Sequence, residues 1–337
     1  MASGLTKFGN DLYTGERSVP FIPLRRIWLT IAAVLMLAAI AVPFVRGGGD
    51  FGSGFNFGIE FRGGSQFQVS GASSLDSDIA TEAVHGVVPD ATVRVTTVGD
   101  DGVRVQTDQL TDPETKEVKA ALEEAYDADQ VDDSFIGASW GADITRQALI
   151  GLGVFLALAA ILMAVYFRTW KMSAAAMVAL AHDLVITVGV YAATGFEITP
   201  AAVIGFLTIL GFSLYDTVVV FDKVRENTSE MGDEPTRTFA ETVNLAVNQT
   251  LVRSINTGVV AALPVAAILF LGSFVLGADT LRDISLALLV GTIIGTYSTP
   301  FVASPFYSLL REREPAIAAR DKKTLALREK SLSSVSS

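Results

Sequence analysis

The side chains best placed to do chemistry in this sequence are ionisable groups set within apolar stretches. Asp216 lies in "GFSLYDTVVVFD", residues 211–222, and no Lys, Arg or His stands beside it. His182 and Asp183 lie near the middle of a second apolar stretch, residues 172–194. An acidic side chain at mid-bilayer depth costs about 2.5–3.5 kcal/mol on insertion scales, so such residues usually serve a purpose. We therefore expect these three residues to be functional or to hold helices together.

Asp216 shares a helical stripe with small and hydroxylated residues. Stepping back from Asp216 by three and four positions reaches Ser213, Ile209, Thr208 and Gly205. Such residues let two helices approach closely and form hydrogen bonds across the contact. The stripe predicts a packed helix–helix face rather than a face toward lipid.

Arg253 precedes another apolar stretch, at a depth compatible with that of Asp216. An arginine neighbour favours the ionised form of a carboxyl group, whereas removal from water favours the protonated form. A conformational change that alternates these surroundings would make Asp216 bind and release a proton. A second interpretation stays open, in which Asp216 is a permanent hydrogen-bonded contact between helices.

His182 and Asp183 are adjacent in the sequence, and neighbouring helical residues point about 100° apart. We therefore expect the two side chains not to share one narrow face. The simplest role of His182 is that of a neutral imidazole bonded to a backbone or hydroxyl group. A role in proton transfer stays open for both residues.

Several other chemistries are not supported by the sequence. There is no cysteine, and the two histidines are nearly a hundred residues apart, so neither disulfides nor a metal site are expected. The sequence contains no phosphate-binding glycine loop and no nucleophile arranged with a base. We expect no cofactor, no metal and no enzymatic activity.

Six stretches are long and apolar enough to cross a bilayer, which takes about 20 residues each. The chain has 337 residues, of which 50% are hydrophobic and 18% charged, and its mean hydropathy is +0.44. Pro300 and Pro305 are expected to break or end the last span. The expected spans are residues 27–45, 148–167, 172–194, 198–221, 255–277 and 284–310. The sequence thus predicts a polytopic α-helical membrane protein, with helices two to six within residues 147–310.

The distribution of charge sets the expected orientation of these spans. Basic residues gather in the segment 1–26, in the loop 222–253 and in the tail 311–337. The positive-inside rule places these segments, and both termini, in the cytoplasm. Residues 46–146 carry 19 acidic and 7 basic side chains and are expected to face outward, and no basic surface suits nucleic acid. A signal peptide cleaved near Ala39-Ile40-Ala41 is the alternative, but the leader and the apolar run are long for one.

The outward segment divides into a glycine-rich element and a small α+β domain. Residues 47–64 contain glycines that permit tight turns, and their phenylalanines indicate packed rather than flexible structure. Residues 65–140 alternate between strand and helix patterns in the order βαββαβ, with a hairpin at "GDDG" and a capping box at Thr111 and Glu114. This order predicts a ferredoxin-like domain.

Two further features bear on packing. Gly291 and Gly295 form a G-x-x-x-G motif in the sixth span, which we interpret as tight packing within this chain, followed by the polar run "TYSTP". The tail from residue 311 onward is expected to be disordered, because it mixes charged runs with terminal serines.

Five stretches in this order resemble SecF, a family of membrane subunits that pair with SecD in bacterial protein export. They are "FNFGIEFRGGSQF", "LAHDLVITVG", "TILGFSLYDTVVVFDKVREN", "NLAVNQTLVRSINT" and "GTIIGTYSTPFVASP". The family's proton-pathway aspartate falls on Asp216 and its partner arginine on Arg253. Its glycine-rich element falls on Gly58, Glu60, Gly63 and Gly64.

The resemblance implies a resistance–nodulation–division type of core, of which these six spans are one half and SecD the other. It implies an inner-membrane protein that works beside the SecY, SecE and SecG channel and uses the proton-motive force to complete preprotein translocation. The partners would be SecD, the channel, the emerging preprotein, membrane lipid and protons.

This sequence departs from the family at three places. Glu60 stands where aspartate is usual, and Tyr215 stands where asparagine is common. The threonine-rich stretch that usually follows the arginine is thinned to "SINTGVVAALP". The rival interpretations are another gradient-driven exporter of the same superfamily, and a passive assembly scaffold.

Overall fold

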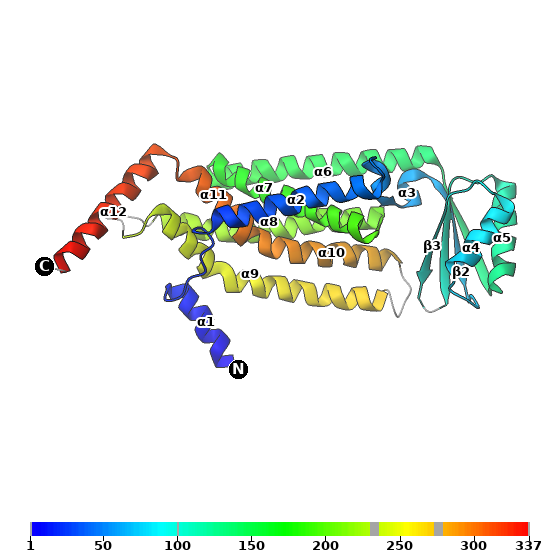
Figure 1. Ribbon diagram of the computed structural model, residues 1–337, viewed down its shortest axis with the longest axis horizontal. Helices are drawn as coiled ribbons and strands as arrows, with labels where there is room; N and C mark the ends of the chain where they lie inside the picture. The colour runs from blue at the N-terminus through cyan, green and yellow to red at the C-terminus, as the bar shows by residue number, and fades with distance from the viewer. Residues whose placement is uncertain (1, 100, 230–235, 273–278, 336–337) are drawn as a thin grey trace.

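The computed structural model describes residues 2–99, 101–229, 236–272 and 279–335. The molecule is elongated, with a bundle of long helices and a small sheet domain at one end (Figure 1). Both ends of the chain lie at the opposite end of the bundle. We call these two ends of the bundle the sheet end and the terminal end.

Six helical runs in the described residues are long and apolar enough to cross a membrane, which confirms the six expected spans. Their limits differ from the predicted ones: α6 begins well before residue 148, and α9 begins well before residue 255, because the helices continue through polar residues outside the apolar core. The end of the predicted fifth span, residues 273–277, lies outside the described residues. The runs are α2 (Arg25–Arg46), α6 (Ala138–Phe167), α7 (Trp170–Thr194), α8 (Pro200–Ser229), α9 (Phe239–Phe270) and α10 with its continuation.

The sixth span corrects the expectation that Pro300 breaks the helix. Here α10 (Asp279–Ser298) passes into the π-helical turn η3 (Thr299–Ala303) and then into α11 (Ser304–Arg311). Proline cannot donate a backbone hydrogen bond, and a π-helical turn accommodates the missing bond without ending the helix. Pro305 lies in the first turn of α11, directly after the π-helical turn, and does not end the helix either.

The sheet domain confirms the expected βαββαβ order of elements. Its four strands lie in the order β3-β4-β2-β5, and each neighbouring pair is antiparallel. The capping box predicted at Thr111 and Glu114 opens α5, whereas the "GDDG" turn includes residue 100, outside the described residues. The elements are β2 (Gly64–Ser70), α4 (Ser77–Val87), β3 (Val93–Val98), β4 (Gly102–Thr107), α5 (Asp112–Tyr126) and β5 (Gln130–Ile136).

Strand β4 shows how the sheet is placed between two layers. Val103 and Val105 point into a core formed with α4 and α5, while all six residues of β4 are buried. Successive residues of a strand point to opposite faces, so Arg104 and Gln106 lie on the other face. That face is turned toward the bundle, and α4 and α5 lie on the far side (Figure 1).

The glycine-rich element packs at the sheet end of the bundle, as its phenylalanines predicted. It forms η1 (Gly52–Gly54), β1 (Asn56–Phe57) and α3 (Ile59–Arg62). Strand β1 pairs in parallel with β6 (Glu197–Ile198), which joins α7 to α8. Phe44, Phe51, Phe55, Phe57 and Phe61 form a continuous row of ring contacts, with centroids 5.0–6.2 Å apart.

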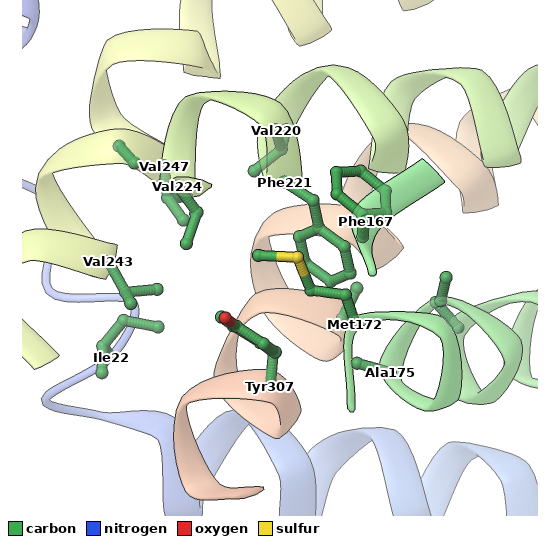
Figure 2. Close-up of a cluster of buried hydrophobic side chains, with 14 of the residues drawn as sticks. Ile22, Phe167, Met172, Ala175, Val220, Phe221, Val224, Val243, Val247 and Tyr307 are labelled. Atoms are coloured by element: carbon green, nitrogen blue, oxygen red, sulfur yellow. The ribbon is translucent and has the colours of Figure 1, made fainter. Parts of the chain in front are cut away.

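A large apolar cluster closes the terminal end of the bundle (Figure 2). Phe221 of α8 lies between Phe167 and Tyr307, with ring centroids 6.0 and 5.3 Å away. Asn248 and Asn244, one turn apart on α9, bind the segment before α2: their side-chain oxygens accept from the backbone N–H groups of Val19 and Ile22. This end of the bundle is therefore held by both packing and buried amide groups.

Two further helices flank the bundle at the terminal end: α1 (Ala2–Thr14) and α12 (Pro315–Val335). The expectation of a disordered tail is wrong for its described part. Residues such as Ala, Leu, Lys and Arg favour helix, and α12 also has fixed partners. Arg328 pairs with Glu241 at 2.7 Å, and Asp321 accepts a bond from the backbone N–H of Phe239 at 2.8 Å.

Candidate functional site

Four ionisable side chains lie buried among the membrane-crossing helices in the described part of the chain. They are His182 and Asp183 on α7, Asp216 on α8 and Asp283 on α10, with 0%, 2%, 6% and 5% of their surface exposed. Groups buried to this extent need hydrogen-bond partners or a functional reason to lack them.

Asp183 is the centre of a satisfied polar network that joins three helices. Its Oδ1 lies 3.1 Å from Nδ1 of His182, and its Oδ2 accepts bonds from the hydroxyls of Ser213 at 2.5 Å and Ser298 at 2.9 Å. On the other side of the imidazole, Nε2 lies 3.3 Å from the hydroxyl of Tyr297. With Nδ1 carrying the proton, both ring nitrogens of a neutral His182 have a partner.

This network corrects the expectation that His182 and Asp183 point apart. The Asp183 side chain is short, and Nδ1 sits close to the point where the imidazole joins its own chain, so the two groups meet despite the 100° step between them. Both side chains are buried, so both directions lead into protein. The simplest role expected for His182, a neutral imidazole bonded to a hydroxyl group, is compatible with this geometry.

Asp216 lies one helical turn beyond Ser213 on α8 and is bound differently. Its Oδ1 accepts a hydrogen bond from the hydroxyl of Ser254 on α9 at 2.7 Å. Its Oδ2 is buried and accepts no hydrogen bond of good geometry among the described residues, although the hydroxyl of Thr299 lies beside the carboxyl group. A buried acceptor left without a partner costs about 1–3 kcal/mol, and more when the group is charged.

The structure does not bring Arg253 onto Asp216. Arg253 is exposed, and its Nη2 lies 3.5 Å from the hydroxyl of Tyr215, which is itself 55% exposed. In the described residues no ion pair links Arg253 with Asp216; the adjacent residue, Ser254, makes the contact instead. Arg253 and Tyr215 thus form a polar contact on the outer surface of α8 and α9.

A stripe of small residues holds α8 against α10 and positions these groups. Added at Gly291, a Cβ atom would lie 2.5 Å from Cγ1 of Ile209; at Gly295, it would lie 3.1 Å from Cβ of Ser213. One turn further, the hydroxyls of Thr217 and Thr299 lie 3.0 Å apart. The G-x-x-x-G motif therefore packs within this chain, as interpreted.

The predicted stripe on α8 is confirmed for three of its four members. Gly205, Ile209 and Ser213 are buried, but Thr208 is exposed and bonds to the backbone oxygen of Ile204. A step of four from Gly205 leads to Ile209 and then Ser213, whereas Thr208 is rotated off that line. The face is narrower than the sequence suggested.

Each of these glycines in the glycine-rich element is required for a different geometric reason. Gly63 ends α3 with φ +77°, and Gly64 has φ +144° where an added Cβ would collide with the backbone oxygen of Thr107. Such backbone angles favour glycine. At Gly58, an added Cβ would collide with a carboxylate oxygen of Glu60 and lie 3.2 Å from one of Glu197.

Glu60 is half-buried, and its Oε2 is the second carboxylate oxygen that is buried without a hydrogen-bond partner within the residues that the structure describes. Burial raises the pKa of this carboxyl group, and the neighbouring charge of Glu197 raises it further. Glu197 itself is bound by the sheet domain: Gln106 donates to it at 2.7 Å, and Arg104 lies 3.5 Å away. This cluster joins the sheet face to the bundle.

Several polar residues of these sites were not identified from the sequence. Ser254 and Tyr297 were missed because their role depends on which way each side chain is turned. Asp283 was missed because it precedes the stretch taken as the sixth span; it accepts a bond from Thr199 at 3.0 Å. The only signal was the polar run "TYSTP", which contains Tyr297 and Ser298.

The comparisons with known proteins agree with one another. A family model described as Protein export membrane protein SecD/SecF, C-terminal, matches residues 117–313, and one described as SecD/SecF GG Motif matches residues 51–71. The chain is 43% identical over 331 residues to Protein translocase subunit SecF of Streptomyces coelicolor, covering 97% of this chain and 86% of that protein. It is 40% identical over 338 residues to the SecF subunit of Mycobacterium tuberculosis, covering 96% of this chain and 74% of that protein.

Solved structures show the same likeness. The crystal structure of SecDF, a translocon-associated membrane protein from Thermus thermophilus, superposes with a TM-score of 0.71 at 28% identity. The match covers 88% of this chain and 39% of the SecDF chain, so this chain spans well under half of that protein. SecDF in a super-membrane-facing form gives a TM-score of 0.58 at 26% identity.

Six membrane-crossing helices, one sheet domain and buried carboxylates define a multi-pass membrane protein. With the family matches and the relatives above, the class can be made specific. The chain belongs to the SecD/SecF family of protein export membrane proteins.

Proposed function

We propose that this chain is an auxiliary subunit of the Sec preprotein translocase, and that it uses the proton-motive force to help complete translocation. It would do so with SecD as the second half of the membrane core and beside the SecY, SecE and SecG channel. The relatives named as translocase subunits support the role. The observation that carries the proton step is the buried, half-satisfied carboxylate of Asp216.

Two buried aspartates in the same bundle differ in how their oxygens are hydrogen-bonded. The difference favours a permanent helix–helix contact for Asp183 and proton transfer for Asp216. Both oxygens of Asp183 are bonded, one to His182 and the other to two serine hydroxyls. A permanent contact between helices should look like this, because every acceptor site is used. Within the described residues, Oδ2 of Asp216 accepts no hydrogen bond of good geometry and has the Thr299 hydroxyl beside it, so Asp216 can accept a proton there without losing the bond from Ser254.

Arg253 supplies the second environment that a relay needs. It lies next to Ser254 in the sequence and on the exposed side of the bundle, with Tyr215 as its neighbour. Docking of the other half of the core on this face would remove Arg253 from water. An unpaired guanidinium is costly once it is out of water. A turn of its long side chain toward Asp216 would then favour the ionised carboxylate, and its withdrawal would favour the protonated one.

The energy available to such a step is sufficient to drive a conformational change. Moving one elementary charge through about 100 mV releases roughly 2.3 kcal/mol. That amount biases a two-state equilibrium nearly fiftyfold. The sheet domain would be the moving part, because Glu197 and Asn56 link it to the connection between α7 and α8.

The proposed orientation follows the positive-inside rule, with both termini in the cytoplasm and the sheet domain outside the cytoplasmic membrane. In that position the domain could hold an emerging preprotein and prevent it from sliding back. The chain would then perform transport rather than catalysis.

The test is secretion of a slow-folding preprotein by cells whose only copy of this chain carries Asp216→Asn. Asparagine keeps the size of the side chain and can still accept a bond from Ser254. Asp222→Asn is the matched control: the same chemical change on α8, at an exposed position. Each strain is measured with and without an uncoupler, after confirming that the chain is made and bound to SecD.

We expect Asp216→Asn to abolish gradient-dependent secretion, so that the uncoupler has no further effect, and Asp222→Asn to secrete normally. Near-normal, uncoupler-sensitive secretion by Asp216→Asn would contradict the relay and leave Asp216 as a structural contact. A passive scaffold likewise predicts little loss of secretion, because the substitution is isosteric and keeps the bond from Ser254.

A further inference from the structure

A basic cavity of about 850 Å³ opens at the terminal end of the bundle. It is enclosed by the segment before α2, the start of α9 and a residue of α12, three parts of the chain that are far apart in the sequence. Four arginines line it, Arg25, Arg26, Arg237 and Arg328, together with one acidic residue, Glu241. The lining therefore carries a formal excess of positive charge.

Among the described residues, two of these arginines form ion pairs and two do not. Arg328 binds Glu241 at 2.7 Å, and Arg25 pairs with Glu312. Arg26 and Arg237 are exposed, and neither forms an ion pair within the described part of the chain. The internal pairs thus fix two walls of the cavity, while Arg26 and Arg237 retain charge for a ligand.

The floor of the cavity is held in place by buried hydrogen bonds. Asn244 on α9 donates to the hydroxyl of Ser18 at 2.8 Å and accepts from the backbone N–H of Ile22 at 3.0 Å. These bonds tie the segment before α2 to α9. A cavity with fixed walls loses little freedom when it binds a ligand, which favours binding.

The cavity lies at the level expected for the surface of the bilayer. Arg25 and Arg26 open α2, and the exposed apolar side chains of Ile27 and Ile31 follow directly. Since α2 is about as long as the membrane core is thick, its first residues lie near the level of phospholipid headgroups. Guanidinium groups bind phosphate oxygens through paired N–H donors, and basic pockets at this level are suited to anionic headgroups.

We infer that this cavity binds a phosphate group between Arg26 and Arg237. The phosphate belongs either to an anionic phospholipid headgroup or to a free phosphate ion, which present the same oxygens to the two arginines. A bound headgroup would tie the start of α2 to the start of α9 and would make assembly of the subunit depend on anionic lipid.

The test compares lipid binding by the purified full chain and by Arg26→Gln/Arg237→Gln, using native mass spectrometry in mild detergent. The probes are dioleoyl phosphatidylglycerol, dioleoyl phosphatidylcholine and inorganic phosphate. The matched control is Arg168→Gln/Arg225→Gln, which removes the same charge from two exposed arginines that do not line the cavity. A thermal melt of each variant confirms that all four arginine positions tolerate glutamine.

We expect the original chain and the control to bind phosphatidylglycerol alike and in preference to phosphatidylcholine. The cavity variant should bind it roughly 30-fold more weakly, since each basic residue near an anionic surface contributes about a factor of five. Competition by millimolar inorganic phosphate, lost in the cavity variant, would identify free phosphate as the ligand. Equal weakening in both variants, or no preference for phosphatidylglycerol and no binding of phosphate, would overturn the site.

Discussion

The contact between α8 and α10 allows a stringent test of the packing that positions Asp183 and Asp216. Substituting Gly291→Ala adds one methyl group at a place where an ideal Cβ would lie 2.5 and 2.6 Å from the two γ-carbons of Ile209. Carbon atoms in contact normally lie 3.5–4.0 Å apart, so the helices must separate or Ile209 must change its rotamer. Overpacking of this kind costs about 1–3 kcal/mol.

The matched control is Gly211→Ala on α8, where an added Cβ meets nothing within 4 Å. Both substitutions remove a helical glycine and therefore share a gain of roughly 0.5–1 kcal/mol from reduced chain entropy. The difference between the two variants isolates the collision. At about 2–4 °C per kcal/mol, the Gly291→Ala protein should melt several degrees below the Gly211→Ala protein.

The assay is thermal unfolding in detergent, followed by circular dichroism. A double variant, Ile209→Ala/Gly291→Ala, removes the γ-carbons and should lose less stability than the sum of its two single changes, because the two sites are in contact. If Gly291→Ala melts like Gly211→Ala, or if the double variant shows no coupling, α8 and α10 do not approach as closely as described.

Two further predictions concern the carboxylates. Asp183→Asn should destabilise the protein by about 2–4 kcal/mol, more than Asp216→Asn, because it disturbs a buried carboxylate with three hydrogen-bonding partners; unfolding in mixed detergent micelles measures both, and a smaller loss at Asp183 would contradict its structural role. Glu60→Gln should raise the melting temperature at pH 8 and have little effect near pH 4. The reason is that a folded-state pKa raised above the usual 4.5 penalises the folded protein only where the group ionises, as the pH rises above 4.5; a pH-independent difference would show that Glu60 is not buried as described.

The outline of the fold could be predicted because it depends on patterns of apolar residues that are visible along the sequence. Long apolar runs identified all six spans, and the alternation of apolar residues identified the strands of the sheet domain. The predicted ends of the spans are wrong where a helix extends beyond its apolar run. The first turns of α6 are polar, yet they remain helical because they pack on α3, where Gly141 approaches the backbone of Phe61.

The candidate site was predicted only as far as depth along a helix allows. Asp216 and Arg253 have compatible depths, but rotation about the axis of α9 turns Ser254 inward and Arg253 outward. A shift of one residue around a helix is about 100°, and an apolar sequence gives few indications of that angle. The contact between His182 and Asp183 has a different cause: the reach of the two side chains, which the angle between helical positions does not give.

The contacts of α8 restrict how a proton on Asp216 could be transmitted. Within about one turn, Ser213 binds Asp183, Thr217 meets Thr299, and Asp216 binds Ser254. The first two contacts join α8 to α7 and to the sixth span, and they are reinforced by the glycine packing, so α8 cannot rotate without breaking several bonds at once. Within the described residues, α8 is linked to α9 at this level by the hydroxyl bond from Ser254 to Asp216 and by an exposed, 3.5 Å contact between Arg253 and Tyr215. If Asp216 changes its protonation state, α9 is therefore the element that can respond with the least loss, and it carries both Ser254 and Arg253.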